Sequence, residues 1–179
     1  MRKIKNAELG RKTVDEFKFA EKLPVVVVLD NVRSLHNIGS VFRSGDAFSV
    51  EAIYLCGISA VPPHREIEKT ALGATESVAW KYFKTTLEAA EELSKSGYSL
   101  VAIEQAEGGT PLDQFVPAEK KYALIFGHEI NGVGEELMEK VDAAIEIPQS
   151  GTKHSLNISV CAGIVLWEFF KRLKVYDLR

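Results

Sequence analysis

Short apolar runs alternate with amphipathic stretches along most of the chain. Residues 24–29 read Pro-Val-Val-Val-Val-Leu, a β-branched run without polar alternation that is typical of a strand covered on both faces. Similar runs predict five further strands, at residues 52–56, 78–83, 100–103, 121–126 and 143–147. Helical spacing of apolar residues predicts helices at residues 37–48, 66–72, 87–95 and 135–140, and a long one at 156–174. This alternation predicts an α/β fold with a mainly parallel sheet of about six strands and helices on both faces.

The predicted sheet also indicates where a ligand would bind. In parallel sheets, ligands bind beyond the carboxyl ends of the strands. This rule points to the loops at residues 104–109, 127–132 and 148–157, with residues 30–37 as a fourth candidate.

The first 22 residues differ from the rest, since they carry seven Lys and Arg residues. They predict a basic N-terminal arm or helix, and residues 23–179 a single domain. The arm is either a solvated leader or a segment that contacts phosphate, and the sequence leaves both open. The arm cations proposed to bind RNA are Arg2, Lys3, Lys5, Arg11 and Lys12.

Composition excludes several classes of protein. An apolar content of 46% and a charged content of 26% are ordinary for a soluble globular chain. A net charge of −3 argues against a uniformly basic nucleic-acid binder but allows local basic patches. No apolar run is long enough for a membrane span, and no signal peptide is expected. Cys56 and Cys161 lack metal-type spacing, so we expect free thiols in a reducing cytoplasm and no metal.

Three motifs follow predicted strands and carry the candidate chemistry. The first spans residues 37–43, where the long Arg43 side chain can lean back towards Asn37 at the helix start. The second, residues 126–134, has closely spaced glycines that permit close backbone approach to a ligand. The third joins Ile147-Pro148 to Ser155-Leu156-Asn157, and its helix start offers groups suited to a polar or anionic ligand. Each alone also fits an ordinary capped helix or turn.

Taken in order, these motifs resemble those of the SpoU (TrmH-like) family of SPOUT RNA methyltransferases. The family pattern Asn-x-Gly-x-x-x-Arg is matched by Asn37, Gly39 and Arg43, and Phe-Gly-x-Glu-x-x-Gly by residues 126–132. Ile-Pro followed by Ser-Leu-Asn-x-Ser is matched by Ile147, Pro148 and residues 155–159. The resemblance covers roughly residues 24–170.

The resemblance implies a fold, a cofactor and an assembly. It implies transfer of a methyl group from S-adenosylmethionine to a ribose 2′-hydroxyl of RNA, and a C-terminal segment threaded into a trefoil knot. It also implies a homodimer through the apolar C-terminal helix. The positions carried over for cofactor binding are Glu104, Gly127, Ile147 and Leu156.

The resemblance further assigns catalytic roles to Arg43, Asn37, Glu129, Ser155 and Asn157. An arginine stays protonated in proteins, so we expect Arg43 to hold the target phosphate and stabilise developing alkoxide charge rather than act as a free base. Asn37 and Glu129 would fix Arg43 or the ribose. Ser155 and Asn157 would orient the cofactor and the substrate.

The RNA is the least defined part of this hypothesis. Transfer RNA is the first expectation, with ribosomal RNA open, and Arg65 and Lys69 near the loop after the second strand are further candidate contacts. One alternative is a non-catalytic RNA-binding protein with the same fold. Another is a redox domain that binds a dinucleotide, against which the absence of GxGxxG after the first strand argues.

Overall fold

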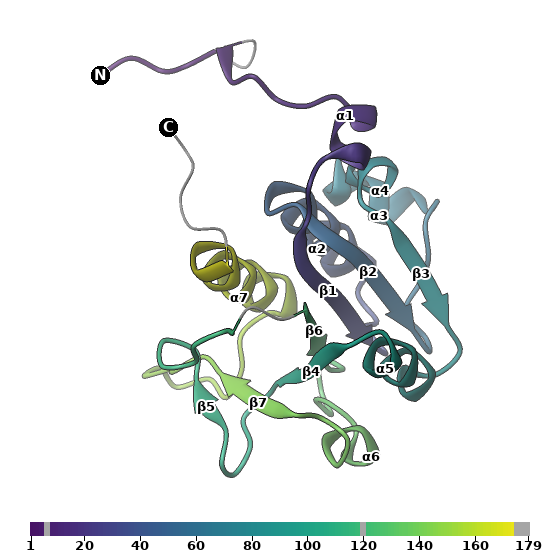
Figure 1. Ribbon diagram of the computed structural model, residues 1–179, viewed down its shortest axis with the longest axis vertical. Helices are drawn as coiled ribbons and strands as arrows, with labels where there is room; N and C mark the ends of the chain where they lie inside the picture. The colour runs from purple at the N-terminus through teal and green to yellow at the C-terminus, as the bar shows by residue number, and fades with distance from the viewer. Residues whose placement is uncertain (6–7, 119–120, 174–179) are drawn as a thin grey trace.

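A computed structural model describes residues 1–5, 8–118 and 121–173, and shows a sheet covered by helices on both faces (Figure 1). The strands are β1 (Leu23–Asp30), β2 (Val50–Cys56), β3 (Trp80–Phe83), β4 (Tyr98–Ile103), β5 (Thr110–Pro111), β6 (Lys121–Phe126) and β7 (Ala143–Glu146). The helices are α1 (Val14–Phe19), α2 (Leu35–Ala47), α3 (Arg65–Ala71), α4 (Ala74–Ser77), α5 (Thr86–Lys95), α6 (Glu135–Met138) and α7 (Ile158–Leu173).

The strand order is β3-β2-β1-β6-β4-β7-β5, and all neighbouring pairs are parallel. The predicted α/β class and parallel sheet are therefore confirmed. The sheet has seven strands where the sequence predicts about six. The additional strand, β5, has two residues and pairs with the end of β7. Two residues are too short a run to predict a strand, and proline is depleted in strands, which is why the sequence pattern misses it.

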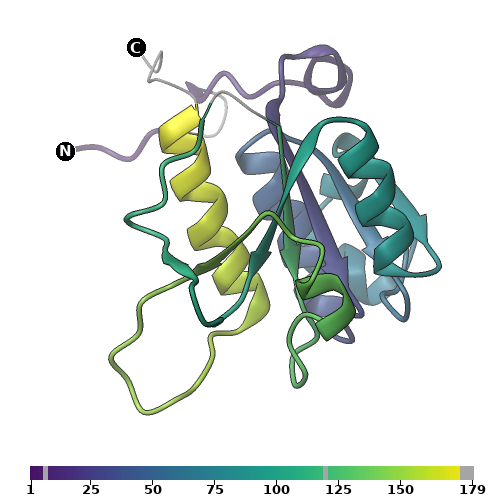
Figure 2. The same cartoon turned by 60° about the horizontal axis from the view of Figure 1, so that its bottom comes forward.

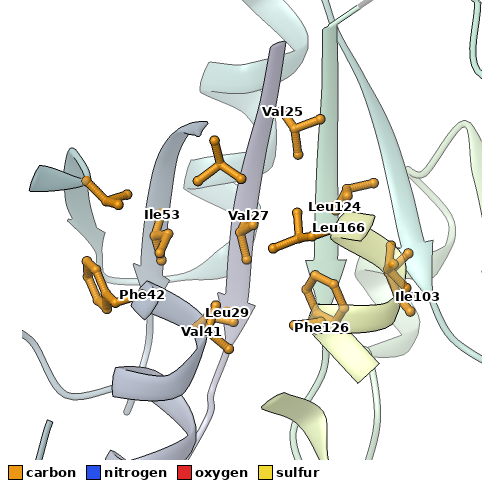
Figure 3. Packing of buried hydrophobic residues seen from close by; sticks show 14 of the residues in the cluster. Val25, Val27, Leu29, Val41, Phe42, Ile53, Ile103, Leu124, Phe126 and Leu166 are labelled. Carbon is orange, nitrogen blue, oxygen red and sulfur yellow. The ribbon is translucent and has the colours of Figure 1, made fainter. Parts of the chain in front are cut away.

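The valine run of β1 is buried because the strand lies in the middle of the sheet, between β2 and β6. Val25, Val27 and Leu29 face the layer that contains α2 and α7, and Val26 and Val28 face α5. Figure 3 shows part of the first layer, with Val25, Val27, Leu29, Val41, Phe42, Ile53, Ile103, Leu124, Phe126 and Leu166. Two apolar layers thus hold the sheet, which explains the lack of polar alternation.

Most predicted elements appear within two residues of their predicted ends. β6 occupies the predicted residues, whereas α7 begins at Ile158, two residues after its predicted start. The predicted end of that helix at Lys174 lies outside the described residues. The single-turn helix α4 was not predicted.

This topology brings the predicted ligand loops to one edge of the sheet. Because the strands are parallel, the loops after β1, β4, β6 and β7 all leave its carboxyl edge. The segment between β7 and α7 forms a wide loop there, visible in yellow-green in Figure 2. The N-terminal arm and α1 lie at the opposite edge, before the start of β1 (Figure 1).

Candidate active site

A pocket of about 480 Å³ lies at the carboxyl edge of the sheet. Its walls come from the ends of β4, β6 and β7, the loops that follow them, and the first turn of α7. Seven of the nine residues predicted for catalysis or cofactor binding line it: Glu104, Gly127, Glu129, Ile147, Ser155, Leu156 and Asn157. The other two, Asn37 and Arg43, lie on α2.

The glycines of the second motif let the loop after β6 fold tightly against itself. A side chain on Gly127 would meet the backbone of Gly132 and Val133 at 2.1 and 2.3 Å. Gly132 has a positive φ of 66°, and its added Cβ would lie 2.2 Å from the Glu104 carboxylate. These positions need glycine for packing, and the pocket wall there is backbone.

The Glu104 carboxylate fixes the far end of the same loop. One of its oxygens accepts a hydrogen bond from the Val133 backbone N–H at 3.1 Å, and the other accepts from Gln105 N–H at 3.0 Å. Hydrogen bonds to a carboxylate are stronger than those between neutral groups. Glu104 therefore shapes the pocket wall as well as lining it.

The Glu129 carboxylate binds the start of α2. Its two oxygens accept from the backbone N–H groups of Arg33 and Ser34 at 3.2 and 3.1 Å, and the Asn37 amide donates to one of them at 3.5 Å. Free N–H groups at a helix start favour an anion, so this contact ties the loop after β6 to α2. Among the described residues, neither Glu129 nor Asn37 forms a hydrogen bond to Arg43.

A second link joins α2 to α7. The Asn157 amide donates to the Asn37 side-chain oxygen at 3.1 Å, and the Asn157 oxygen accepts from the Ser159 N–H at 2.9 Å. Asn157 thus caps α7 and holds Asn37 at the same time. Ser155 lies beside them, exposed, in the pocket wall.

Two groups at the site have shifted pKa values. Partial burial opposes ionisation of Glu129, but the backbone hydrogen bonds it accepts outweigh this effect and lower its pKa. Burial raises the pKa of the Cys161 thiol to about 11, with a smaller contribution from the nearby Glu104 charge. At neutral pH the pocket therefore has an ionised Glu129 and a neutral thiol.

Arg43 lies outside this pocket. Its exposed side chain lines a second, open hollow of about 580 Å³ between α2, α3 and α7. Ser40, Ser44, Thr70 and Lys69 contribute polar groups to the same hollow. Within the described part of the chain, the Arg43 guanidinium has no ion pair.

The cations predicted to contact RNA fall into two groups. Arg65 begins α3, and Lys69 one turn later pairs with Glu66 at 2.7 Å and lines the hollow of Arg43. The other five, Arg2, Lys3, Lys5, Arg11 and Lys12, are exposed along the arm at the other edge of the sheet, and Arg2 pairs with Glu8.

The sequence motifs did not single out all residues that line the pocket. Glu146, Gln149 and Cys161 also line it. Only their positions in the sequence could have identified them: Glu146 ends β7, Gln149 lies in the predicted ligand loop, and Cys161 lies near the start of α7. In the described ranges, no group of three His, Cys, Asp or Glu residues is placed to hold a metal ion. Nor does any described helix have the length and apolar character to cross a membrane.

Comparison with known proteins gives a consistent result. Residues 24–167 match the model of the SpoU rRNA Methylase family. The chain is 33% identical over 148 residues to the 23S rRNA (guanosine-2'-O-)-methyltransferase RlmB of Nitrosomonas europaea, covering 83% of this chain and 56% of that protein. It is also 30% identical to a protein of Staphylococcus saprophyticus assigned to the TrmH family of tRNA/rRNA methyltransferases, with 89% and 63% covered. The chain thus spans less than two thirds of these relatives' lengths.

Solved structures share the fold. An rRNA methyltransferase from Sinorhizobium meliloti with bound AdoMet matches with a TM-score of 0.79 and 26% identity, over 86% of this chain and 61% of that one. The TrmH/SpoU tRNA modifying enzyme of A. aeolicus matches with a TM-score of 0.78 and 26% identity, over 89% and 80%.

Proposed function

The chain belongs to the SpoU rRNA methylase family, and from this premise we propose that it is an S-adenosylmethionine-dependent RNA methyltransferase that modifies a ribose 2′-hydroxyl. The observation that carries the proposal is the pocket at the carboxyl edge, where segments of the second and third motifs meet the end of β4. The 2′-hydroxyl target is supported by the relative RlmB, a guanosine-2′-O-methyltransferase.

The pocket suits S-adenosylmethionine in size and chemistry. A volume of about 480 Å³ lies in the range of small-molecule sites. The wall formed by Gly127 and Gly132 has no room for a side chain, which leaves backbone groups open to a ligand. Ile147 and Leu156 would supply apolar contacts and Glu104 a carboxylate. When bound, S-adenosylmethionine supplies a methyl group already activated on a sulfonium sulfur.

The chain's own residues must then activate the ribose hydroxyl, which is a poor nucleophile until its proton leaves. An arginine side chain stays protonated in proteins, so we assign Arg43 to hold the target phosphate and to stabilise negative charge on the 2′-oxygen. Its exposure and lack of an ion pair among the described residues leave its charge available for RNA. The proton would leave through the phosphate or a water molecule.

The remaining catalytic candidates would position these groups. Glu129 holds the start of α2 and Asn37, and Asn157 holds Asn37 from the other side. We propose that this chain of contacts fixes Asn37 for the ribose. Ser155, which lines the pocket, would orient cofactor and substrate.

The RNA substrate would be a transfer RNA or a ribosomal RNA. The tRNA modifying enzyme of A. aeolicus supports the first and RlmB the second. Arg65, Lys69 and the arm cations would contact its backbone. An RNA substrate and the free Cys56 and Cys161 support the cytoplasm as the place of action.

We also propose a homodimer through α7. Val160, Ile164 and Trp167 are 52%, 39% and 42% exposed and lie at helical spacing along one stripe. Phe48 and Phe170 pack on the Trp167 ring and extend the apolar surface. Light scattering tests the dimer, and a stable monomer at micromolar concentration would contradict it.

The trefoil knot implied by the resemblance is part of the proposal. The connection from β4 to β6 passes through β5 at the far edge of the sheet and contacts α7 on its way. Phe115 stacks on Phe169, and Arg172 donates to the Asp113 carbonyl at 2.8 Å. An experimental structure traced through residues 104–121 and 148–173 tests the threading.

Methyl transfer from labelled S-adenosylmethionine into unmodified tRNA and, separately, rRNA tests the function. The RNA is digested to nucleosides after reaction, and an Arg43→Ala protein is the control. Label in a 2′-O-methylnucleoside, lost with Arg43→Ala, is expected. Cofactor binding without label in any RNA would count against the substrates named. Absence of both cofactor binding and label would favour the non-catalytic RNA-binding alternative.

A further inference from the structure

Beyond the pocket, the carboxyl edge of the sheet continues as a rim of linked loops towards β3. The Glu129 carboxylate holds the backbone of residues 33–34 after β1. The side-chain oxygen of Asn31 accepts from the Ile58 N–H at 3.2 Å, which joins the loops after β1 and β2. The Tyr82 hydroxyl donates to the Gly57 carbonyl at 3.0 Å, which joins the end of β3. The rim is therefore continuous with the candidate active site.

Two aromatic side chains are exposed at the far end of this rim. Trp80 and Tyr82 are 38% and 47% exposed, and lie two residues apart on the same face of β3. β3 is one of the two edge strands of the sheet (Figure 1). The Tyr82 hydroxyl donates a hydrogen bond to the Gly57 carbonyl, and this bond holds the Tyr82 ring in a defined position with part of the ring exposed to solvent.

The rim also carries positive charge on a chain whose net charge is −3. Three cations are exposed on the rim: Arg33 in the loop after β1, Arg65 at the start of α3 after the loop that follows β2, and Lys84 directly after β3. None of the three forms an ion pair with an acid in the part of the chain that the structure describes. Glu66, an acid of the same region, is engaged by Lys69 and His36. The rim therefore offers cations beside aromatic rings.

We propose that this rim binds a single-stranded segment of the RNA next to the methylated nucleotide, with a base stacked on Tyr82. The inference rests on the proposed function and names the surface that holds its substrate. Three strand spacings separate β6 from β3, or roughly 14 Å, a span that a few nucleotides cover. Arg33, Arg65 and Lys84 attract the phosphates, and Trp80 offers a second ring.

RNA fits this surface better than a protein strand. An edge strand of four residues exposes too few backbone groups to template a stable added strand. Exposed rings with cations beside them are the usual features of single-strand binding, since every base has a face that can stack and every nucleotide a phosphate.

The test compares RNA affinity and methyl transfer for wild type, Tyr82→Ala, Tyr82→Phe, Lys84→Ala and Lys95→Ala. The RNA is unmodified bulk tRNA and rRNA, and binding is measured at several salt concentrations. Tyr82→Ala should weaken RNA binding about tenfold through loss of stacking, whereas Tyr82→Phe keeps the ring and should stay within about twofold. Lys84→Ala should reduce the salt slope by about one, unlike Lys95→Ala on α5. Cofactor affinity should not change in any variant.

Each other outcome has a defined meaning. An RNA affinity of Tyr82→Ala within about twofold of wild type overturns the proposal that the rim binds RNA, and leaves the proposed function intact. Wild-type protein that binds RNA without methylating it counts against the proposed function. The affinities of the Tyr82 variants then still test whether the rim binds RNA. Wild-type protein that binds no RNA overturns both. A change in molecular mass of Tyr82→Ala by light scattering makes this face a protein interface and overturns the RNA assignment.

Discussion

The pocket and the rim lie on opposite sides of the start of α2, and their polar groups differ in whether they have partners within the chain. In the pocket, Glu104, Glu129 and Asn157 all have hydrogen-bond partners within the chain. On the rim, Arg33 and Lys84 are exposed and have no ion pair among the described residues, and the same holds for Arg43 in its separate hollow. Groups with internal partners hold a geometry in place before binding, and cations without partners remain available for phosphate. The difference separates residues that build the site from residues that bind RNA.

The largest effect expected on the pocket side comes from Gly127→Ala. The new Cβ would lie 2.1 Å from the backbone of Gly132, which cannot move without opening the loop. We expect a loss of at least about 2 kcal/mol in the free energy of unfolding, together with loss of cofactor binding. Gly134→Ala is the matched control, because its Cβ meets nothing within 4 Å and its φ is −61°. Equal stability of the two variants, measured by urea unfolding, would contradict the claim that the loop after β6 has no room for a side chain at Gly127.

The Arg43→Ala substitution should distinguish most clearly between a residue that builds the site and a residue that binds RNA. We expect methyl transfer to fall by about 100-fold or more, because charge on the 2′-oxygen loses its stabilising partner. The free energy of unfolding should change by less than about 0.5 kcal/mol, since Arg43 is exposed and unpaired in the described structure. Cofactor affinity, measured by calorimetry, should stay at the wild-type value. Arg43→Lys should recover only part of the rate, because a lysine cannot bind phosphate through a planar fork. Full turnover by Arg43→Ala would disprove the assigned role.

Glu129→Gln tests whether a carboxylate at the start of α2 stabilises the fold. We expect a loss of about 1 kcal/mol at neutral pH. The folded-state pKa of Glu129 is lowered, so its stabilising effect is present above the pKa of the unfolded state and is lost as pH falls through the folded-state value. The difference in stability between wild type and variant should therefore shrink below about pH 4. A difference that stays constant from pH 7 to pH 3.5 would mean that the charge plays no part.

The smallest effect expected is that of the link between α2 and α7. Asn157→Asp keeps the side-chain oxygen that accepts from the Ser159 N–H and removes the amide group that donates to Asn37. A double-mutant cycle with Asn37→Ala should give a coupling energy of roughly 0.5–1 kcal/mol in urea unfolding. Additive losses would show that the two side chains do not depend on each other.

Sequence pattern was sufficient for elements whose signal is local. The Val25–Val28 run, the strand at residues 121–126 and the helical spacing of α2 needed no partner to be identified. β5 escaped prediction because its two residues become a strand only by pairing with β7. The strand order, with β6 between β1 and β4, is equally a product of tertiary contacts.

The candidate site divides in the same manner. The motifs and their order pointed to the loops that line the pocket, since these lie after predicted strands. They could not show that Glu129 binds the backbone at the start of a helix about 95 residues earlier in the chain, or that Arg43 faces a different hollow. Both depend on how α2 packs against its neighbours, and Gly39 shows how tightly α2 packs against α3. Its added Cβ would lie 2.2 Å from the Ile67 carbonyl.

The central place of β6 has a consequence for the chain as it is made. β1 pairs with β2 soon after synthesis, but its other edge waits for residues 121–126, about 95 positions later. At ordinary rates of translation that interval lasts about 5 to 20 seconds. During that time the valine-rich edge of β1 is open to other chains, as an unpaired strand edge is a template for aggregation. We therefore expect a nascent chain of this fold to benefit from shielding of this edge, by a chaperone or by the ribosome surface, until β6 has been synthesised.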